Sequence, residues 1–415
     1  MGSVIIIGGG IIGLCSAYYL QKEGHSVIIL DKSDMLDGCS YGNAGYLSPS
    51  HFIPLATPGI VKQGFKWMLN SKSPFYVQPK LDINLLKWGL HFIKSATKDH
   101  SLRSAIPLRD ISLLSKKLYE EIALAPGYDF HYENKGMIEL FKTELNAHHA
   151  SELVSQSHSL GLEAVMLNKN DVQALEPDLE LDVMGGIHFK CDAHLYPNKL
   201  MEDLKRDLVS KGVSISTNVE VTGFITEKLL IKGLRTSQGE YYADDFVLAT
   251  GAVTGEVAKK LNLTVPMIGG RGYSVTFDSP PFKVHHPIIL TEARVAITPM
   301  AGTKVRFGGT MEITSFNTPA KLQRVEGIFK SVKKYFPAFN LPIPCDKIWY
   351  GYRPCSADGL PYIGRAKKYT NLVIASGHAM LGLSLGAGTG KLVSEVITKQ
   401  PLSVDLTAFD PDRFA

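Results

Sequence analysis

Three glycines near the start of the chain, Gly8, Gly10 and Gly13, have a spacing that suits the binding of a pyrophosphate. The first permits a tight turn, the second lets the backbone approach a phosphate, and the third lets a helix pack closely on a strand. An apolar run over residues 4–7 precedes them, and apolar residues at helical spacing follow over 11–20. The pattern therefore predicts a strand, a turn and a helix whose N-terminus faces an anion.

An acidic residue stands where a dinucleotide would need one. A second apolar run, residues 27–30, ends at Asp31, about 18 residues after Gly13. At that distance the carboxylate can accept hydrogen bonds from a ribose. The alternative is a glycine-rich turn in an ordinary sheet, but strand, glycines and acid together favour a βαβ unit that binds a dinucleotide.

The composition limits the other possibilities. The chain has 415 residues, 45% hydrophobic and 20% charged, which is typical of a folded protein of two or three domains or of one core with a large insertion. The 44 basic and 40 acidic side chains leave a net charge of +4, which is too small for a nucleic-acid footprint, so no nucleic acid is expected as a partner. No unbroken apolar run of about 18 residues is present, so no membrane span is expected.

Cysteines and histidines do not indicate a metal site. The five cysteines lack CxxC spacing, which argues against a disulfide framework or a zinc ribbon and favours a reducing, cytoplasmic location. The pairs His148-His149 and His285-His286 lack the partners of an HExxH motif, so we expect solvated histidines and no metal.

A glycine-rich stretch near the C-terminus imitates two catalytic motifs. Residues 382–386 match GxSxG, but a hydrolase of that fold needs a later histidine, and none follows His378. Residues 388–391 resemble a phosphate-binding loop, but Leu385 and Leu392 stand where glycine and Ser or Thr are required. We therefore expect these glycines to pack the final helix on a sheet.

Two further groups of segments predict additional strands of the nucleotide-binding sheet and a sheet in a second domain. Residues 201–211 have a helical pattern, residues 213–221 alternate like a strand, and an apolar run at 246–248 leads into Ala249-Thr250-Gly251. We expect these to return to the nucleotide-binding sheet. Short β-rich segments separated by Pro or Gly predict an antiparallel sheet in a second domain; they cover residues 272–277, 295–298 and 304–309.

Several motifs together carry a family resemblance. In chain order they are the glycine fingerprint, Ser40-Tyr41-Gly42-Asn43-Ala44-Gly45, Ala249-Thr250-Gly251, Gly351-Tyr352-Arg353-Pro354, Asp358-Gly359-Leu360-Pro361 and Gly377-His378. With these motifs the chain resembles the FAD-dependent D-amino-acid dehydrogenase family, within the D-amino-acid oxidase and glycine oxidase superfamily, over nearly its whole length. Oxidases proper are a poorer match, because residues 291–296 lack their pocket tyrosines.

The resemblance implies an α/β fold with two domains. An FAD-binding, Rossmann-like domain of the glutathione-reductase type would take residues 1–85, 150–265 and 345–415. An α+β substrate domain built on an antiparallel sheet would take residues 86–149 and 266–344.

The resemblance also implies a non-covalent FAD in an extended conformation. Small residues after the glycine turn would let the backbone approach the flavin, and amides at the start of the final helix would stabilise its reduced ring. A cysteine that could tether the flavin is absent from its expected place, which Gly351 occupies. The expected cofactor-binding residues are Gly8, Gly10, Ile11, Ile12, Gly13, Asp31, Lys32, Ser40, Asn43, Ala44, Gly45, Leu47, Val219, Thr250, Gly251, Gly382, Leu383 and Ser384.

For the substrate, the resemblance points to five residues. Arg353 would present a planar fork to a carboxylate, the alternative being a surface salt bridge. Tyr273 would add a phenol donor to that carboxylate or be an ordinary core tyrosine. His51 and His378 would line the pocket or simply pack, and the carbonyl of Met380 would receive the substrate amine.

The predicted reaction is oxidative deamination of a D-amino acid, with hydride transfer from Cα to flavin N5 and an imino acid as product. No acid or base residue is required if the amine binds neutral. The alternative is oxidation of D-hydroxyproline, proline or N-methyl amino acids, as in sarcosine and glycine oxidases. A flavin domain acting on tRNA is a remote alternative that would need a basic groove.

Electrons are predicted to leave to a quinone or another carrier at the inner face of a membrane. Between Lys62 and Lys98, basic residues alternate with large apolar ones, which is typical of an interfacial helix. The alternative is that the tryptophans pack over the substrate domain and the lysines are solvated. The lysines are at 62, 66, 72, 80, 87, 94 and 98, and the apolar residues are Phe65, Trp67, Met68, Phe75, Leu85, Leu86, Trp88 and Phe92.

Overall fold

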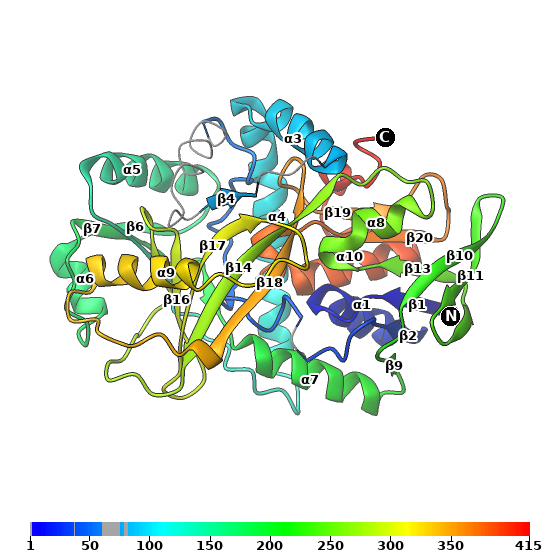
Figure 1. The fold of residues 1–415 in the computed structure, drawn as a ribbon, viewed down its shortest axis with the longest axis horizontal. Helices are drawn as coiled ribbons and strands as arrows, with labels where there is room; N and C mark the ends of the chain where they lie inside the picture. Colours follow the sequence, from blue (N-terminus) through cyan, green and yellow to red (C-terminus); the bar gives the residue numbers. More distant parts are fainter. Residues whose placement is uncertain (1, 37, 60–74, 79–81) are drawn as a thin grey trace.

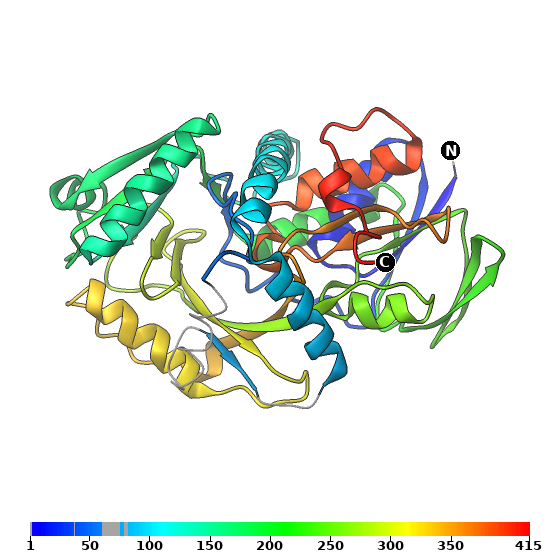
Figure 2. The same cartoon turned by 90° about the horizontal axis from the view of Figure 1, so that it is seen from above.

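The structure is a computed structural model that describes residues 2–36, 38–59, 75–78 and 82–415. It has two main sheets side by side, with both chain termini beside the smaller one (Figures 1 and 2). The long strands in the middle of Figure 1 belong to the larger sheet and run toward the smaller one.

The smaller sheet has six strands and carries the predicted nucleotide-binding unit. Five strands are parallel, and β19 at the edge is antiparallel. The predicted strands at 4–7, 27–30 and 246–248 are confirmed in it. The strand order is β19 (Tyr362–Arg365), β20 (Leu372–Ser376), β13 (Asp245–Leu248), β1 (Ser3–Ile7), β2 (Ser26–Leu30) and β9 (Ser214–Ser216).

Both faces of this sheet are buried, which is why its strands are almost continuously apolar. On β1, Val4 and Ile6 pack among helices, whereas Ile5 and Ile7 pack toward a three-stranded sheet and α8. The helical layer holds α1 (Ile11–Lys22), α4 (Lys98–Ala123), α7 (Pro197–Ser210) and α10 (Gly386–Thr398), and the opposite layer holds β10 (Val221–Glu227), β11 (Leu230–Thr236), β12 (Gly239–Tyr242) and α8 (Thr254–Lys259).

The larger sheet has nine of the described strands. Helices α5 (Glu144–Ser159), α6 (Lys169–Leu175) and α9 (Leu322–Tyr335) lie around it, and α3 (Ile83–Ser95) lies along the top of the molecule in Figure 1. The strand order is β18 (Ile348–Ser356), β14 (Met267–Phe277), β17 (Val305–Ile313), β16 (Val295–Pro299), β15 (Ile288–Leu290), β5 (Met137–Phe141), β7 (Gly185–Phe189) and β6 (Ala164–Asn168), with β4 (Phe75–Val77) paired to β17.

The remaining elements are short. They are the pair β3 (Tyr46–Leu47) and β8 (Ala193–His194), and the 3-10 turns η1 (Gly251–Val253), η2 (Cys345–Lys347), η3 (Ala379–Leu381) and η4 (Thr407–Phe409).

Two details of the predicted second domain need correction. Its sheet is mixed rather than antiparallel, because β5 pairs with β15 and β4 with β17 in parallel. The strand pairing also departs from the predicted boundaries. Strands β6 and β7, from the range 150–265, and β18, from the range 345–415, are hydrogen-bonded into the larger sheet. These pairings are long-range, so no local pattern indicated them.

Two local expectations also differ from the structure. Residues 213–221 do not form one strand: β9 ends at Ser216, and the chain turns through Asn218, which has φ +58°, before β10. The C-terminal glycines pack α10 on helices rather than on a sheet. A Cβ on Gly390 would lie 2.4 Å from the backbone of Cys15 in α1, and one on Gly388 would lie 3.0 Å from Ser115 in α4.

Candidate functional site

A cavity of about 1780 Å³ extends from the glycine turn after β1 to the ends of β14, β17 and β18. It is lined by all but three of the predicted site residues. Gly13, Gly45 and Leu47 are the exceptions, and each lies just behind the wall. The cavity therefore brings the predicted cofactor-binding and substrate-binding residues to one place.

The glycine turn and the start of α1 suit a bound phosphate. Gly8 has φ +108°, and a Cβ there would lie 2.4 Å from the carbonyl oxygen of Ala249. A Cβ on Gly13 would lie 1.9 Å from the Gly8 carbonyl oxygen, so its role is close packing. The first turn of α1 has no acidic residue, and its Ile11 amide donates to Ser40 Oγ at 3.0 Å. The positive end of the helix dipole thus faces the cavity.

Asp31 lies at the cavity wall after β2, as predicted, and it also fixes the turn. Its Oδ2 accepts from the Gly9 amide at 2.7 Å, and its Oδ1 accepts from the amide and hydroxyl of Ser33, both at 2.8 Å. The Val219 amide donates to the Asp31 carbonyl at 2.8 Å, and Lys32 lies exposed at the rim. A ribose hydroxyl would therefore meet a carboxylate that is already held in place.

The loop over residues 40–45 is held by a residue that the sequence did not indicate. Arg306 is buried and donates from Nη1 to the carbonyls of Tyr41 at 2.8 Å and Asn43 at 2.6 Å. Desolvation lowers the pKa of Arg306 to about 10. Gly42 lies under the indole of Trp349, where a Cβ would come within 2.0 Å of the ring. A single arginine in a strand has no sequence signature of this role.

The two predicted residues behind this loop support it. Gly45 has φ +82°, and a Cβ there would lie 2.2 Å from the carbonyl oxygen of Leu195. Leu47 is fully buried and pairs with Ala193 between β3 and β8.

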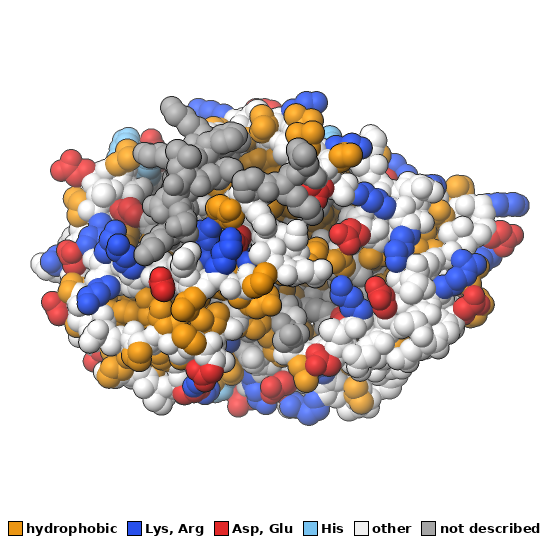
Figure 3. Space-filling model, in the orientation of Figure 1, with side chains coloured by type: hydrophobic (Ala, Val, Ile, Leu, Met, Phe, Trp, Pro, Cys, Tyr) orange, Lys and Arg blue, Asp and Glu red, His pale blue; other side chains and the backbone are white. Residues whose placement is uncertain are grey.

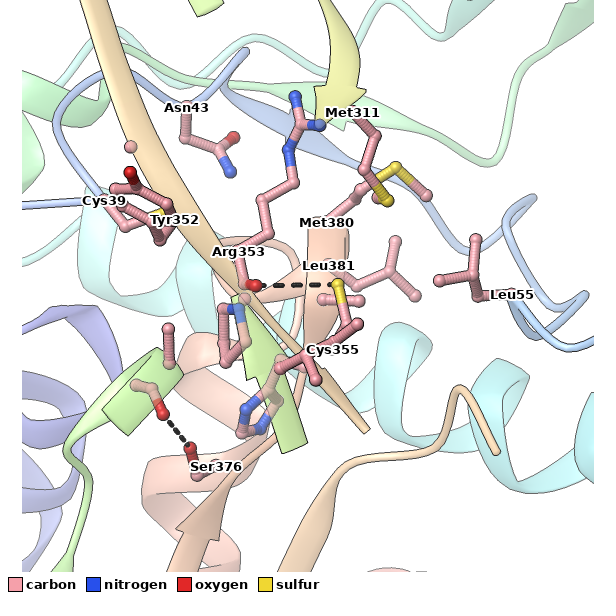
Figure 4. Close-up of a pocket in the computed structure, with 18 of the residues that line it drawn as sticks. Cys39, Asn43, Leu55, Met311, Tyr352, Arg353, Cys355, Ser376, Met380 and Leu381 are labelled. Carbon is pink, nitrogen blue, oxygen red and sulfur yellow. Dashed lines mark hydrogen bonds between the residues drawn. The ribbon is translucent and has the colours of Figure 1, made fainter. Parts of the chain in front are cut away.

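Arg353 projects from β18 into the cavity (Figure 4). Its guanidinium crosses Gly272 of β14, where a Cβ would lie 2.3 Å from Nη2. Nη1 donates to the carbonyl of Thr310 at 2.6 Å, and no carboxylate among the described residues pairs with this side chain. Desolvation lowers the pKa of Arg353. A desolvated cation without an anion is costly, so this site favours an anionic ligand.

A bulge in β17 aims the Thr310 carbonyl at Arg353. Arg271 pairs with Glu312 and Tyr273 pairs with Gly309, so the pairing of β14 with β17 shifts between them. Thr310 lies in the bulge with φ +61°, which is rare for a β-branched residue. Such strain is typical of functional sites, where the surrounding structure enforces it.

The hydroxyl of Tyr273 is already engaged. It donates to Glu312 Oε2 at 3.1 Å and accepts from the Lys321 amide at 3.1 Å. The same Oε2 accepts from Arg271 Nη2 at 2.7 Å. These contacts favour the alternative of a core tyrosine over the predicted bond to a substrate carboxylate.

The turn before α10 forms a further wall. Tyr119 of α4 donates to the Leu383 carbonyl at 2.8 Å, and the Ser48 amide donates to Ser384 Oγ at 2.8 Å. The amides of Leu383 and Ser384 have no acceptor within the described parts of the chain, so they can donate to a ligand. This agrees with the expected position of a flavin carbonyl.

Both predicted histidines line the cavity and are held neutral by burial. His378 Nε2 lies 3.0 Å from Thr389 Oγ1, and its pKa is lowered to about 3. His51 Nδ1 lies 3.2 Å from Ser50 Oγ, and its pKa is lowered to about 4. Neither imidazole therefore adds a positive charge at neutral pH.

Apolar side chains surround Arg353 on the other sides. In Figure 4, Met311, Met380, Leu381 and Leu55 lie on one side of the arginine. All four line the cavity, and Met380 remains 45% exposed. A ligand held by Arg353 would therefore present its other groups to an apolar wall.

The described residues contain no group of three or more His, Cys, Asp or Glu suited to a metal ion. Nor do they include a helix that combines the length and apolarity needed to cross a bilayer. The thiols at Cys15, Cys39, Cys191, Cys345 and Cys355 are all free.

The chain is similar to known proteins over almost its whole length. A family model described as DAO, FAD dependent oxidoreductase, matches residues 3–396. The D-amino acid dehydrogenase of Granulibacter bethesdensis is 30% identical over 99% of both chains, and that of Helicobacter pylori is 30% identical over 95% of this chain and 94% of the other.

Solved structures share the fold at lower identity. Glycine oxidase from Geobacillus kaustophilus superposes with a TM-score of 0.79 at 22% identity and covers 100% of this chain and 99% of its own. L-proline dehydrogenase from P. horikoshii superposes with a TM-score of 0.76 at 17% identity, covering 99% and 97%. These likenesses concern the arrangement of the elements.

Proposed function

Because this chain belongs to the DAO family of FAD-dependent oxidoreductases, we propose that it is a dehydrogenase that oxidises D-amino acids at the bond between Cα and nitrogen. The relatives that carry the name D-amino acid dehydrogenase support this substrate class. The cofactor is FAD, and the family match and the glycine turn agree on this point.

One observation carries the proposal. The guanidinium of Arg353 lies in the cavity with no carboxylate partner among the described residues, next to an apolar wall. A free α-carboxylate would complete a charge-assisted pair there, and a side chain of moderate size would contact Met311 or Leu381.

The residues present fit an extended FAD. The start of α1 and the glycine turn would hold the pyrophosphate, Asp31 would hold a ribose, and the amides of Leu383 and Ser384 would face the flavin. When bound, FAD supplies the acceptor for the hydride that leaves Cα.

The protein itself orients the substrate. Arg353 fixes the carboxylate, the carbonyl of Met380 lies at the cavity wall where it can accept from the substrate nitrogen, and the apolar side chains exclude water from Cα. Water then hydrolyses the imino acid product, or a cyclic imine leaves intact.

Anaerobic bleaching of the flavin across a substrate panel tests this function. The panel contains D- and L-alanine, D-leucine, D-hydroxyproline, D-proline, sarcosine and glycine. Fast bleaching by D-amino acids with primary amines would support the proposal. Faster bleaching by D-hydroxyproline, proline or sarcosine would instead support the alternative, an enzyme for secondary amines.

We also propose that a quinone or similar carrier takes the electrons, at a membrane surface that α3 contacts. Four large apolar side chains of α3 lie on one face and are exposed: Ile83 by 71%, Leu86 by 65%, Leu90 and Ile93 each by 54%. Figure 3 shows orange side chains beside blue ones at the top of the molecule, where Figure 1 places α3. The same helix lines the cavity, which supports a path from the carrier to the flavin.

This face differs from the one expected. Trp88 is buried and donates from Nε1 to the Cys355 carbonyl at 3.0 Å, and Phe92 stacks on it at 4.8 Å between ring centroids. Leu85 also packs inward. The rest of the expected interfacial segment, residues 62–72 and Lys80, lies outside the described residues.

Co-sedimentation with anionic liposomes at low salt tests the membrane contact. The chain should bind, and Leu86→Ser with Leu90→Ser should reduce binding at least tenfold. Equal binding by this variant would contradict the assignment of α3. Rapid peroxide formation during turnover would contradict the quinone acceptor.

A further inference from the structure

A buried carboxyl group is connected to the cavity by two hydrogen-bonded side chains. Asp192 is fully buried, and its Oδ2 accepts from Ser50 Oγ at 2.6 Å. Ser50 Oγ lies 3.2 Å from His51 Nδ1. Ser50 and His51 line the cavity, whereas Asp192 lies behind them.

The pairing of β3 with β8 brings these residues together from distant parts of the chain. Leu47 of β3 pairs with Ala193 of β8, so the residues after β3 pass Asp192, which directly precedes β8. The Ser50 amide also donates to Asp192 Oδ1, at 3.0 Å. Both oxygens of the carboxyl group are therefore directed toward the loop that carries His51.

The contacts define the direction of each hydrogen bond. When Asp192 is ionised, Ser50 donates its only hydroxyl hydrogen to the carboxylate, so the Ser50 oxygen is left to accept from His51 Nδ1–H. His51 Nε2 is then the unprotonated ring nitrogen. It has no hydrogen-bond partner among the described residues, and the ring borders the cavity. A basic nitrogen is thus available to a ligand.

Few other charged groups surround this chain of residues. Lys116 of α4 donates from Nζ to the Cys191 carbonyl at 2.7 Å, and the Cys191 thiol donates to Asp192 Oδ1 at 3.4 Å. Burial raises the pKa of Asp192 to about 7, and Lys116 and the donors from Ser50 oppose that rise. Burial alone lowers the pKa of His51 to about 4. The carboxyl group is therefore the better holder of a proton.

A base in the cavity would let the protein oxidise a substrate that arrives as the ammonium ion, whereas without a base only the neutral amine could react. The substrate is an ammonium ion near neutral pH, and its nitrogen must release a proton before its lone pair can assist hydride loss from Cα. The guanidinium of Arg353 can bind the substrate carboxylate. The backbone carbonyls near it can accept a hydrogen bond from the ammonium group, but they are too weakly basic to take its proton.

We propose that His51, Ser50 and Asp192 form a proton relay that deprotonates the substrate ammonium group. This inference rests on the proposed function; it gives His51, already expected at the pocket, a catalytic role and adds Ser50 and Asp192 as positioning residues behind it. The N–H bond of the substrate breaks as His51 Nε2 gains a proton. His51 Nδ1–H passes its proton to Ser50, and Ser50 passes its own to Asp192. The net change is one proton moved from nitrogen to carboxylate.

The pH dependence of flavin reduction tests the relay. The measurement is the rate of anaerobic flavin reduction from pH 6 to 10 by the D-amino acid that bleaches the wild type fastest; it compares the wild-type holoenzyme with Asp192→Asn, Ser50→Ala and His51→Gln. The wild-type rate should fall as the pH drops below an apparent pKa near 7. In each variant this acidic limb of the pH profile should move up by at least one pH unit, so that the rate is lower by about tenfold or more at pH 7 and recovers at pH 10.

Controls separate the relay from a structural role. His148→Gln and Ser155→Ala change exposed residues of the same types and should leave the pH limb unchanged. Flavin content should stay at the wild-type level in all variants. A uniform loss of rate at every pH, or an acidic limb that does not move, would overturn the relay alone. Failure of every amino acid to bleach the wild type would overturn the proposed function, and the relay with it.

Discussion

Replacement of Arg353 by alanine should remove the recognition of the substrate carboxylate without disturbing the bound flavin. The side chain has one hydrogen bond to the protein among the described residues, to Thr310, and no carboxylate partner. A charge-assisted pair contributes about 1.5 to 3 kcal/mol. Since about 1.4 kcal/mol is a factor of ten, kcat/KM should fall by roughly 10- to 150-fold. Removal of a desolvated cation should leave the melting temperature nearly unchanged.

A neutral substrate makes the test specific. The wild type should prefer a D-amino acid over its carboxamide by about the same factor, because the amide cannot form the ion pair. In Arg353→Ala this preference should be close to one. Arg353→Lys keeps the charge but loses the planar fork, so its preference should be intermediate.

Steady-state kinetics with both substrates, and the absorbance of the bound flavin, measure these effects. Arg103→Ala is the matched control, since Arg103 is a surface arginine whose side chain is 74% exposed. If Arg353→Ala still preferred the acid over the amide as strongly as the wild type does, Arg353 would not be the carboxylate-binding residue.

Four further results should follow. Tyr273→Phe should leave KM within about twofold, because its hydroxyl is bonded inside the protein; a tenfold rise in KM would place it on the substrate. Arg306→Met should lower the affinity for FAD at least tenfold, measured by flavin titration, since two carbonyls of the 40–45 loop lose their donor. Burial raises the pKa of Asp192 to about 7 from an ordinary value of about 3.9, so the protonated carboxyl group stabilises the folded protein below pH 4, and this stability is lost as the pH rises through 7. The melting temperature of Asp192→Asn relative to that of the wild type should therefore increase between pH 5 and 8. A difference that stays constant over this range would contradict the raised pKa. Acid precipitation should release the yellow colour, because burial raises the pKa of Cys355 to about 12 and leaves a neutral thiol that does not attack a flavin.

Local patterns predicted the parts of this molecule that depend on neighbours in sequence. The βαβ unit requires a glycine turn directly after a strand, and the residues of that turn, from Gly8 to Gly13, adopt the predicted form. Asp31 could be located because it follows β2 directly. The positions of these residues are set by hydrogen bonds within a short length of chain.

Long-range contacts could not be read from the same patterns. The engagement of Tyr273 with Glu312 depends on the pairing of β14 with β17, and Thr310 faces Arg353 because of a bulge in that pairing. Asp192 approaches Ser50 through a pair of two-residue strands. A family resemblance located Arg353 and His51, but it gave no information about the groups behind them.

The environment of Arg353 also decides which charges a substrate can carry. Burial keeps His51 and His378 neutral, so neither imidazole adds to the positive charge of Arg353. One α-carboxylate satisfies the arginine. A second negative charge on the side chain would lose its hydration where it lay against Met311 or Leu381. A positive charge on the substrate nitrogen meets the same difficulty unless the site removes its proton. Next to Met311 and Leu381 an uncharged substrate side chain is therefore favoured, and removal of the ammonium proton, as proposed for His51, would lower the cost of burying the substrate nitrogen.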